Sequence, residues 1–270
     1  MTADLLSPFN LTGRIALVTG GSGGIGRACV ERLAAYGATV ALTFVEGVED
    51  AARVLAGFGD LPVTAHPLDL RDADSIRRCI AGVAAQHGRI DILVNNAAVG
   101  TATVAAFSDD PGTQDSLMLA INADGTLKMC QEFLALPGGP GRKLINISSV
   151  GGGITAFPGF RLSDGMSKAA VAFLTRQLAA EAVHDEVDVF AICPGATNTP
   201  MFQASTLSKL STETLSGFLA GLPKGRLIEP AEIAALVHFL SGPSSRVLHG
   251  AVLDASMGLG VRPGLLSEQA

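Results

Sequence analysis

Seven short apolar segments alternate with amphipathic stretches along most of this 270-residue chain. Strands that are buried on both faces form continuous apolar runs, and helices between them cover both sides of a parallel sheet. The alternation therefore predicts an α/β fold with a doubly wound, seven-stranded parallel sheet in a single domain over residues 1–270. The expected strands are 15–18, 39–44, 63–68, 90–94, 143–147, 187–192 and 251–253.

Charge and composition restrict the partners. Only 16% of the residues are charged and the net charge is -6, so neither a nucleic-acid groove nor a basic membrane surface has electrostatic support. No segment reaches the roughly 20 apolar residues of a membrane span, and residues 1–10 lack the features of an export signal. We expect a soluble, cytoplasmic protein that acts on a small molecule.

Four cysteines lie far apart in apolar segments, at Cys29, Cys79, Cys130 and Cys193. Their spacing matches no metal-binding motif, so they are predicted to be reduced, buried thiols. The histidines His87, His184 and His238 fall on predicted helices without a ligand pattern. The sequence predicts no metal site.

A glycine-rich turn joins the first predicted strand to a helix predicted over residues 25–36. The turn reads Thr-Gly-Gly-Ser-Gly-Gly-Ile-Gly over residues 19–26. Glycines let the backbone approach a pyrophosphate, and the positive end of the following helix favours its charge. Taken alone, the same residues could form only a tight connection between strand and helix.

Further motifs follow in order along the chain. Asp69-Leu70 follows the third predicted strand, Asn95-Asn96-Ala97-Ala98 follows the fourth, and Pro194 to Thr199 follow the sixth. Together with the glycine turn and with Asn122, Ser149 and Lys168, they resemble the short-chain dehydrogenase/reductase family over nearly the full length. Each polar residue taken singly could instead satisfy backbone groups in a loop or helix.

The resemblance implies a Rossmann fold that binds a nicotinamide cofactor, and it implies a homotetramer or homodimer. It places Asn122, Ser149 and Lys168 in the active site, and it implies a mobile substrate lid at about residues 201–222. The cofactor-binding residues that it implies are Thr19, Gly20, Ser22, Gly24, Ile25, Gly26, Asp69, Leu70, Asn96, Ala97, Lys168, Pro194, Gly195, Thr197 and Thr199.

The end of the second predicted strand favours NADP(H) over NAD(H). NAD-preferring proteins usually carry an acidic residue there that binds the ribose hydroxyls. Phe44-Val45 occupies this place, so the carboxylate that would repel a 2′-phosphate is missing. Two features favour NAD(H) instead, namely the nearby Glu46 and the glycine at position 23, where NADP-using relatives often have arginine.

The main departure from the family lies four residues before Lys168, where the family's proton-donating tyrosine is replaced by Asp164. Tyr36 is the only tyrosine in the chain. Keeping an aspartate neutral at pH 7 requires its pKa to rise by roughly 3 units, about 4 kcal/mol, and a cationic Lys168 opposes that rise. We therefore expect Asp164 to be ionised and suited to binding a cation.

These observations predict a reductase that transfers hydride to an iminium, an imine or a similar cationic electrophile, with Asp164 as an electrostatic anchor. At this one position the chain is similar to fungal reductase/Diels-Alderases that reduce iminium-like substrates. Two other functions remain open, a conventional carbonyl or alcohol oxidoreductase with a substituted proton donor, and a nucleotide-binding pseudoenzyme or cofactor-using cyclase.

Two structural alternatives concern the same segment. Ser163 or Asp164 could simply cap the helix that runs toward Glu181. The interval from Ser149 to Asp164 is also about two residues longer than in the typical family pattern, which puts the role of the serine in doubt. Arg161 could bind an anionic substrate group or remain a solvated loop charge.

Overall fold

The computed structural model describes residues 9–262, which form a sheet with all seven strands parallel, in the order β3-β2-β1-β4-β5-β6-β7. Residues 1–8, most of the segment in which the sequence predicts no export signal, lie outside this range. The strands are β1 Ile15–Val18, β2 Thr39–Phe44, β3 Val63–Pro67, β4 Ile92–Asn95, β5 Arg142–Ile147, β6 Val187–Pro194 and β7 Val252–Ala255. The predicted sheet and its parallel direction are confirmed.

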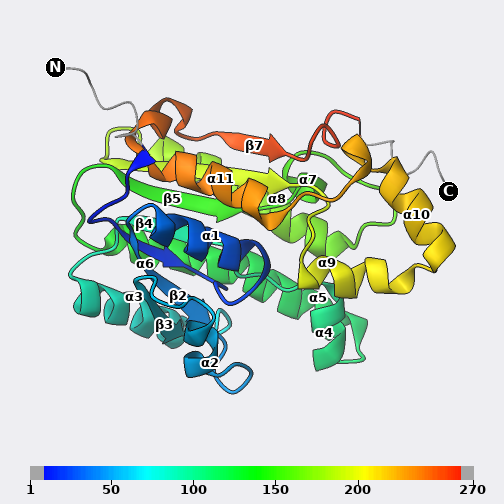
Figure 1. Ribbon diagram of the computed structural model, residues 1–270, viewed down its shortest axis with the longest axis horizontal. Coiled ribbons are helices and arrows are strands. Elements are labelled where there is room, and N and C mark those ends of the chain that lie inside the picture. The colour runs from blue at the N-terminus through cyan, green and yellow to red at the C-terminus, as the bar shows by residue number, and fades with distance from the viewer. Residues whose placement is uncertain (1–8, 263–270) are drawn as a thin grey trace.

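Helices follow the strands and cover both faces of the sheet (Figure 1). The helical segments before β6 are α1 Gly24–Ala35, α2 Ala51–Ala56, α3 Ala73–His87, α4 Thr101–Phe107, α5 Pro111–Leu119, η2 Ala120–Gly125, α6 Thr126–Ala135, α7 Val150–Gly153 and α8 Leu162–Glu181. Those after β6 are α9 Pro200–Ser205, η3 Leu207–Lys209, α10 Thr212–Gly221, η4 Pro223–Gly225, α11 Pro230–Ser241 and η5 Pro243–Leu248.

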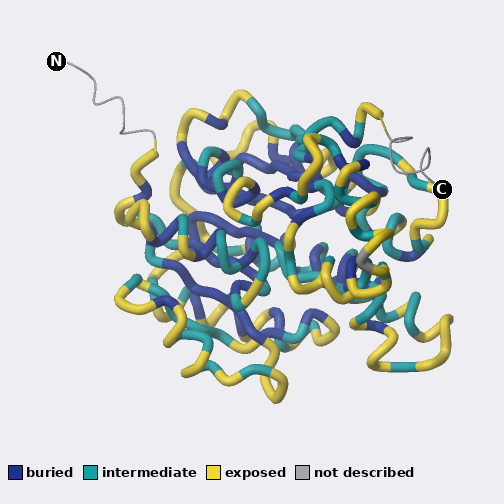
Figure 2. Tube along the Cα trace, turned by 45° about the vertical axis from the view of Figure 1, so that its right-hand side comes forward, coloured by how far each residue is buried: buried dark blue, intermediate teal, exposed yellow. Residues whose placement is uncertain are grey.

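Alternate residues of each strand enter two separate apolar cores, because successive strand side chains point to opposite faces. In β1, Val18 packs with α1 and α11 on one face, whereas Leu17 packs with α3, α6 and the end of α8 on the other. Figure 2 shows the buried trace running through the centre of the molecule. All four cysteines are free and buried, as predicted.

Element boundaries differ from the sequence prediction where a polar residue takes over the hydrogen bonding. β4 begins at Ile92 instead of Ile90. The Asp91 carboxylate accepts a hydrogen bond from the backbone N of Ile15 at 2.8 Å, so this residue ties β4 to β1 from outside the strand. His184 lies in the turn after α8 and not on a helix, because α8 ends at Glu181.

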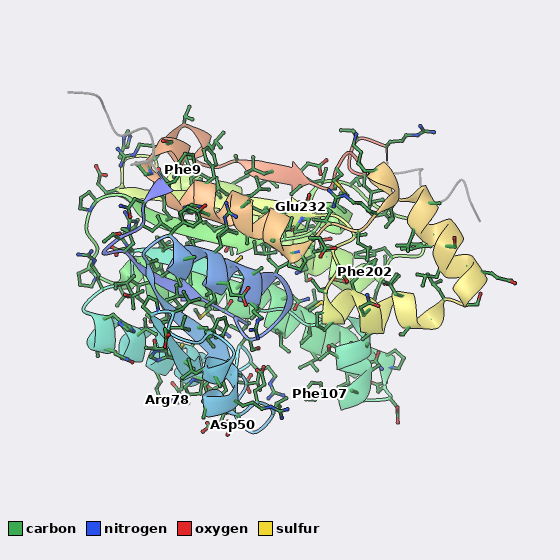
Figure 3. The ribbon with its side chains drawn as sticks, viewed as in Figure 1. Phe9, Asp50, Arg78, Phe107, Phe202 and Glu232 are labelled. Atoms are coloured by element: carbon green, nitrogen blue, oxygen red, sulfur yellow. The ribbon has the colours of Figure 1, made fainter. Side chains whose placement is uncertain are left out.

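The single tyrosine lies at the end of α1. Tyr36 is the C-cap residue of this helix, and its ring centroid lies 4.0 Å from that of His238 in α11. The His238 Nε2 atom lies 2.7 Å from the carbonyl oxygen of Phe9. The contact between these two rings joins the first helix to the last long helix, at the end of the molecule where Phe9 is labelled in Figure 3.

The carboxyl ends of the parallel strands share one edge of the sheet. Figure 1 shows α7, α9, α10 and the start of α8 gathered at this edge, beyond the arrowheads of β5 and β7. Phe202 of α9 and Glu232 of α11 are labelled in the same region in Figure 3. In open α/β sheets this edge holds the ligand crevice. Within residues 9–262, no helix is long and apolar enough to cross a membrane.

Candidate active site

The glycine turn between β1 and α1 is held from both neighbouring strands. The Thr19 hydroxyl accepts hydrogen bonds from the backbone N atoms of Asn96 at 2.9 Å and Ala97 at 3.0 Å. The Asn96 side chain donates in return to the carbonyl oxygens of Thr19 and Gly20. On the other side, the backbone N of Gly20 donates to the Thr43 hydroxyl of β2 at 3.0 Å. The turn is therefore rigid.

Two of its glycines are required for different reasons. Gly20 has φ +62°, a conformation that side chains rarely adopt, whereas Gly26 has no space beside it. A Cβ at Gly26 would lie 2.1 Å from the Gly20 carbonyl oxygen and 2.5 Å from Asn96 Nδ2. The helix N-terminus is consequently drawn tightly against the turn.

This turn fits the pyrophosphate of a dinucleotide. α1 begins at Gly24 with a Gly23 cap that supplies no side chain, and its first turn holds no acidic residue. The first backbone N–H groups of a helix lack partners within it, and its dipole favours an anion. Ser22 and Ile25 flank these groups and are both partly buried.

The opposite side of the crevice is the loop from Pro194 to Thr199. A Cβ at Gly24 would lie 3.3 Å from Thr199 Cγ2, so the two loops approach each other across the strand ends. The Thr199 hydroxyl accepts from the backbone N of Phe202 and caps α9, and the Thr197 hydroxyl donates to the Gly195 carbonyl. The predicted binding threonines therefore also hold their own loop in shape.

Asp69 and Leu70 follow β3 as predicted, but the carboxylate already has a partner. Arg71 Nη2 lies 2.6 Å from Asp69 Oδ2, and this hydrogen-bonded arginine lowers the pKa of Asp69. Leu70 is buried, and a Cβ at Gly125 would lie 2.8 Å from its Cβ. The backbone N of Asp69 donates to the Ser75 hydroxyl, and its carbonyl accepts from the backbone N of Asp72, so these groups also have partners within the protein.

The end of β2 has the features predicted from the sequence. After Phe44 the chain turns back, and the Glu49 carboxylate accepts from the backbone N of Val45 at 3.0 Å. Glu46 is exposed. Arg27, the first arginine after the glycine turn, donates to Glu31 and to the Gly57 carbonyl. One of the two acidic residues near the expected ribose position is therefore already occupied.

Asn122 occupies a single π-helical turn between α5 and α6. Its side chain exchanges two hydrogen bonds with the backbone of Val99, at 2.8 and 3.0 Å. It also donates to the Ser167 hydroxyl at 3.4 Å, and Ser167 donates to the Asp164 carbonyl. Asn122 thus connects the loop after β4 with the first turns of α8.

Lys168 lies one helical turn after Asp164 and is partly buried. Its backbone carbonyl accepts from the Ser148 hydroxyl at 2.8 Å, which fixes α8 to the end of β5. Its ammonium group makes no hydrogen bond or ion pair within residues 9–262. Burial lowers the pKa of Lys168, and the charges of Asp164 and Cys193 oppose this change.

Asp164 caps nothing. α8 begins at Leu162 with Arg161 as the N-cap residue, which makes no side-chain cap bond. Ser163 donates to Asp115 instead, at 2.6 Å. The Asp164 carboxylate is partly buried and has no hydrogen bond or ion pair among the residues described. The helix-cap alternative is therefore wrong for both Ser163 and Asp164.

The charge state of Asp164 depends on two opposing effects. Burial raises its pKa above the ordinary value, and the positive charges of Lys168 and Arg161 pull it back. The opposing effect of Lys168 agrees with the sequence prediction, but burial outweighs it and the net direction of the pKa change is upward. Arg161 itself lies against α5, where it binds Asp115 and Gln114, so it is neither a solvated charge nor free for a substrate.

The longer interval between Ser149 and Asp164 forms a glycine-lined kink. Ser149 accepts from the backbone N of Gly151 at 3.2 Å and caps the short α7. Gly152 has φ +92°, and a Cβ there would lie 2.2 Å from the Gly165 carbonyl. The kink therefore packs backbone to backbone against α8, directly beside Asp164.

An aromatic ring completes this region. A Cβ at Gly151 would lie 3.1 Å from Phe160 Cε1, and one at Gly165 would lie 3.5 Å from Phe160 Cδ1. Phe160 therefore spans the kink and the first turn of α8, and its ring remains 38% exposed. The aromatic ring of Phe160 and the carboxylate of Asp164 thus come from the same short segment, four residues apart.

Sequence reasoning missed several residues that position this site. Thr43 holds the glycine turn, Ser167 joins Asn122 to Asp164, and Ser148 anchors Lys168. Cys193 lies close enough to Lys168 for their charges to interact, and burial raises its pKa. The usable signals were adjacency to Lys168 for Ser167 and to Pro194 for Cys193.

Comparison with known proteins agrees with the fold and the motifs described above. Residues 20–260 match the family model described as Enoyl-(Acyl carrier protein) reductase. The chain belongs to the short-chain dehydrogenase/reductase family. The family prediction is thereby confirmed, and the protein is an oxidoreductase by descent.

Three relatives illustrate the similarity. The rhamnolipid-biosynthesis 3-oxoacyl-[acyl-carrier-protein] reductase of Pseudomonas aeruginosa is 35% identical over 258 residues, covering 93% of this chain and 97% of that protein. Oxidoreductase UcpA of Salmonella typhimurium is 34% identical over 250 residues, covering 89% and 92%. The Pseudomonas aeruginosa RhlG/NADP active-site complex superposes with a TM-score of 0.81 at 31% identity, covering 94% and 99%.

Proposed function

We propose that this short-chain dehydrogenase/reductase is an NADPH-dependent reductase of an iminium or protonated imine carbon. The observation that supports this proposal is the Asp164 carboxylate, which is partly buried beside Lys168 without a partner among the described residues. A buried carboxylate without a partner is costly, and a cationic substrate would supply the missing charge.

The cofactor would lie between the glycine turn and the 194–199 loop. The α1 N-terminus and the backbone of Thr19 to Gly26 would hold its pyrophosphate, and the partly buried Lys168 would bind its nicotinamide ribose. Bound NADPH supplies a hydride to the electrophilic carbon. NADP(H) is favoured by the hydrophobic end of β2 and by the relative that was solved with NADP.

Each active-site side chain then has a distinct role. Asp164 binds and orients the positive nitrogen, and its charge favours substrates that arrive as cations. The Phe160 ring, which lies against Gly165 next to Asp164, would add a cation–π contact worth about 0.5–2 kcal/mol. The product amine forms when the C=N carbon accepts the hydride, so an iminium substrate requires no proton donor at the tyrosine position.

The α9 to α10 segment would close over this substrate. Residues 201–222 form α9, η3 and α10, and the rings of Phe202 and Phe218 lie 6.3 Å apart on α9 and α10. The outer turns of α10 are largely exposed (Figure 2). We propose that this segment is the predicted lid, with its apolar inner residues as the cover.

The decisive experiment replaces the charge and keeps the shape. Asp164→Asn should leave the Kd for NADPH within about twofold of wild type and lower kcat/KM for cyclic imines by roughly 10–100-fold, the loss expected for one charge-assisted contact. Asp124→Asn is the matched control, because it removes an exposed acid of η2 that pairs with Lys128 of α6. Equal imine turnover in the two variants and in wild type would refute the charge anchor.

A conventional carbonyl reductase is the second candidate, because one relative named above is an oxidoreductase and another is a 3-oxoacyl-[acyl-carrier-protein] reductase. Asp164→Tyr would then restore a proton donor four residues before Lys168. Under this alternative the variant should reduce ketones faster than wild type does.

The pseudoenzyme or cyclase alternative predicts a different result. Wild type and Asp164→Tyr would then both bind NADPH but consume it with neither imines nor ketones.

A further inference from the structure

A second, cationic cavity lies at the edge of the sheet opposite the active site. It has a volume of ≈ 240 Å³ and is lined by Arg14, Gly141, Lys143, Pro243 and Arg246. Arg14 immediately precedes β1, Lys143 lies at the start of β5, and Arg246 belongs to η5. Because all strands are parallel, their amino ends meet here, far from the glycine turn at their carboxyl ends. The volume far exceeds the roughly 10–15 Å³ that one water molecule needs.

Three positive side chains converge on this cavity. Arg14 and Arg246 are both close enough to Lys143 for their charges to lower its pKa, after burial as the larger cause. The Lys143 side chain is only 2% exposed, so its charge is carried inside the protein and not on a solvated surface. Such convergence of like charges is unfavourable unless anions offset it, and each of the three cations has one carboxylate partner nearby.

The nearby carboxylates do not occupy the cavity. Asp188 lies 2.5 Å from Lys143 Nζ, Asp91 lies 3.8 Å from Arg14 Nε, and Glu186 lies 2.9 Å from Arg246 Nη2. None of the three is among the residues that line the cavity. Asp91 is in addition shared with Arg89. The lining of the cavity therefore carries three cationic side chains and no carboxylate.

Donor groups also remain available. The Arg14 Nε–H is buried and has no hydrogen-bond partner, although the same guanidinium donates to the Gly141 carbonyl at 2.7 Å. Lys143 Nζ donates to Asp188 and to the Ser245 hydroxyl, and an ammonium group has three hydrogens to donate. The Arg14 Nε–H and one hydrogen of the Lys143 ammonium group thus lack a hydrogen-bond acceptor among the described residues, although the Asp91 carboxylate lies 3.8 Å from that arginine nitrogen.

We propose that this cavity is a binding site for a phosphate group, either inorganic phosphate or the phosphate of a small monoester. A tetrahedral dianion matches three converging cations better than a single carboxylate does, and guanidinium groups donate to its oxygens in a fork. The inference does not depend on the proposed reaction, because the site and the active site lie at opposite ends of the strands.

The test is calorimetric titration of the full chain with inorganic phosphate and, separately, with glycerol 3-phosphate. We expect saturable binding of one anion per chain, weakened by added NaCl. Each titration is run with and without saturating NADPH, because the cofactor crevice also binds phosphates. A cavity site gives the same Kd in both conditions, whereas binding that disappears with NADPH belongs to the crevice and overturns the proposal.

Variants assign the binding to the cavity. Arg246→Gln changes a residue that is 62% exposed, so folding should be preserved, and it should weaken phosphate binding about tenfold or more. Arg77→Gln, an exposed α3 arginine paired with Asp74, is the matched control and should bind like wild type. Lys143→Met, checked for folding by its thermal transition, should abolish binding.

Unchanged binding in Arg246→Gln, or no saturable binding of either probe to wild type, would overturn the site. Tighter binding of the monoester than of inorganic phosphate would identify an organic phosphate as the ligand.

Discussion

Asp164 and Lys168 stand one helical turn apart without neutralising each other. Burial displaces both pKa values toward the uncharged form, upward for the acid and downward for the base. Neither charged group has a hydrogen-bonding partner among the described residues. Such a pair is suited to receiving two different ligand groups, a ribose hydroxyl at the lysine and a cation at the carboxylate.

The pH dependence of turnover should report the carboxylate. Because the pKa of Asp164 is raised and its ionised form is the proposed active form, kcat/KM for an iminium substrate should fall as pH drops through that raised value. The loss should therefore begin above the range of an ordinary aspartate. Stopped-flow rates across pH 4 to 8 would measure it, at about half-unit steps. An acid limb of the same position in Asp164→Asn would assign the ionisation to another group.

Gly26 offers a second test at a single position. Gly26→Ala places a methyl group against the Gly20 carbonyl and the Asn96 amide, so the turn must open. We expect NADPH affinity to fall at least tenfold, about 1.4 kcal/mol, by fluorescence titration. Gly82→Ala on the exposed face of α3 is the control, because nothing lies within 4 Å of its Cβ position and its φ is not positive. Comparable losses in both variants would argue against the specific clash.

Among the elements, the strands follow most directly from the sequence. β1 and β2 have the predicted bounds, because continuous apolar runs with β-branched residues leave little choice. β4 and the helix ends shift by one or two residues, where side chains such as Asp91 compete with backbone pairing. The kink around Gly152 could not be predicted, because it depends on contact with Gly165, which only the folded chain brings near.

The site residues also fall into two groups, those that the local sequence predicts and those whose roles depend on the folded structure. The glycine turn, Asn96 and Lys168 could be placed because each follows a predicted strand or lies on a predicted helix. The roles of Ser167 and Thr43 depend on distances across the sheet, which no local pattern contains. The direction of the Asp164 pKa change was also inaccessible, since burial is a property of the assembled fold.

The kink should control the first turn of α8 without forming part of the cofactor crevice. Gly152→Ala combines strain at φ +92° with a clash against the Gly165 carbonyl. We expect at least a tenfold lower kcat with nearly unchanged NADPH affinity, about 1.4 kcal/mol in the barrier. Gly159→Ala has a similar φ of +76° but nothing within 4 Å, and so isolates the strain. Equal activity in the two variants would show that the contact is unimportant.

The start of α11 makes a prediction about acid stability. The Arg226 guanidinium and the backbone N of Glu229 lower the pKa of Glu232 from 4.5 to about 2. A depressed pKa adds stability that is present above about pH 4.5 and is lost as pH falls toward 2. In urea titrations, Glu232→Gln should flatten the decline in unfolding free energy over this window. Glu213→Gln, in the first turn of α10, should not.

At the scale of the whole molecule, the exposed face of α8 is unusually apolar. Leu162, Met166 and Phe173 are 83%, 59% and 66% exposed, and they recur at helical spacing on one side of the helix. Exposed apolar stripes of this kind mark association surfaces. We propose that two copies of the chain meet here, in the homodimer or homotetramer that the family resemblance implies.

Light scattering after size exclusion would test this surface. Phe173→Glu places a charge in the middle of the stripe and should yield monomers at micromolar concentration. Val48→Glu, at a residue 76% exposed in the loop after β2, should keep the wild-type mass. A monomeric wild-type protein would contradict the proposed assembly at once.

The contact between Tyr36 and His238 has a practical consequence for measuring all of this. The chain contains no tryptophan, so Tyr36 is its only strongly fluorescent side chain. Because its ring lies on an imidazole that joins α1 to α11, its emission should report the separation of these two helices during unfolding. The reduced nicotinamide emits at longer wavelength, where the apoprotein is dark. Cofactor release and helix separation can therefore be followed in one sample without any added label, because the two emissions have different wavelengths.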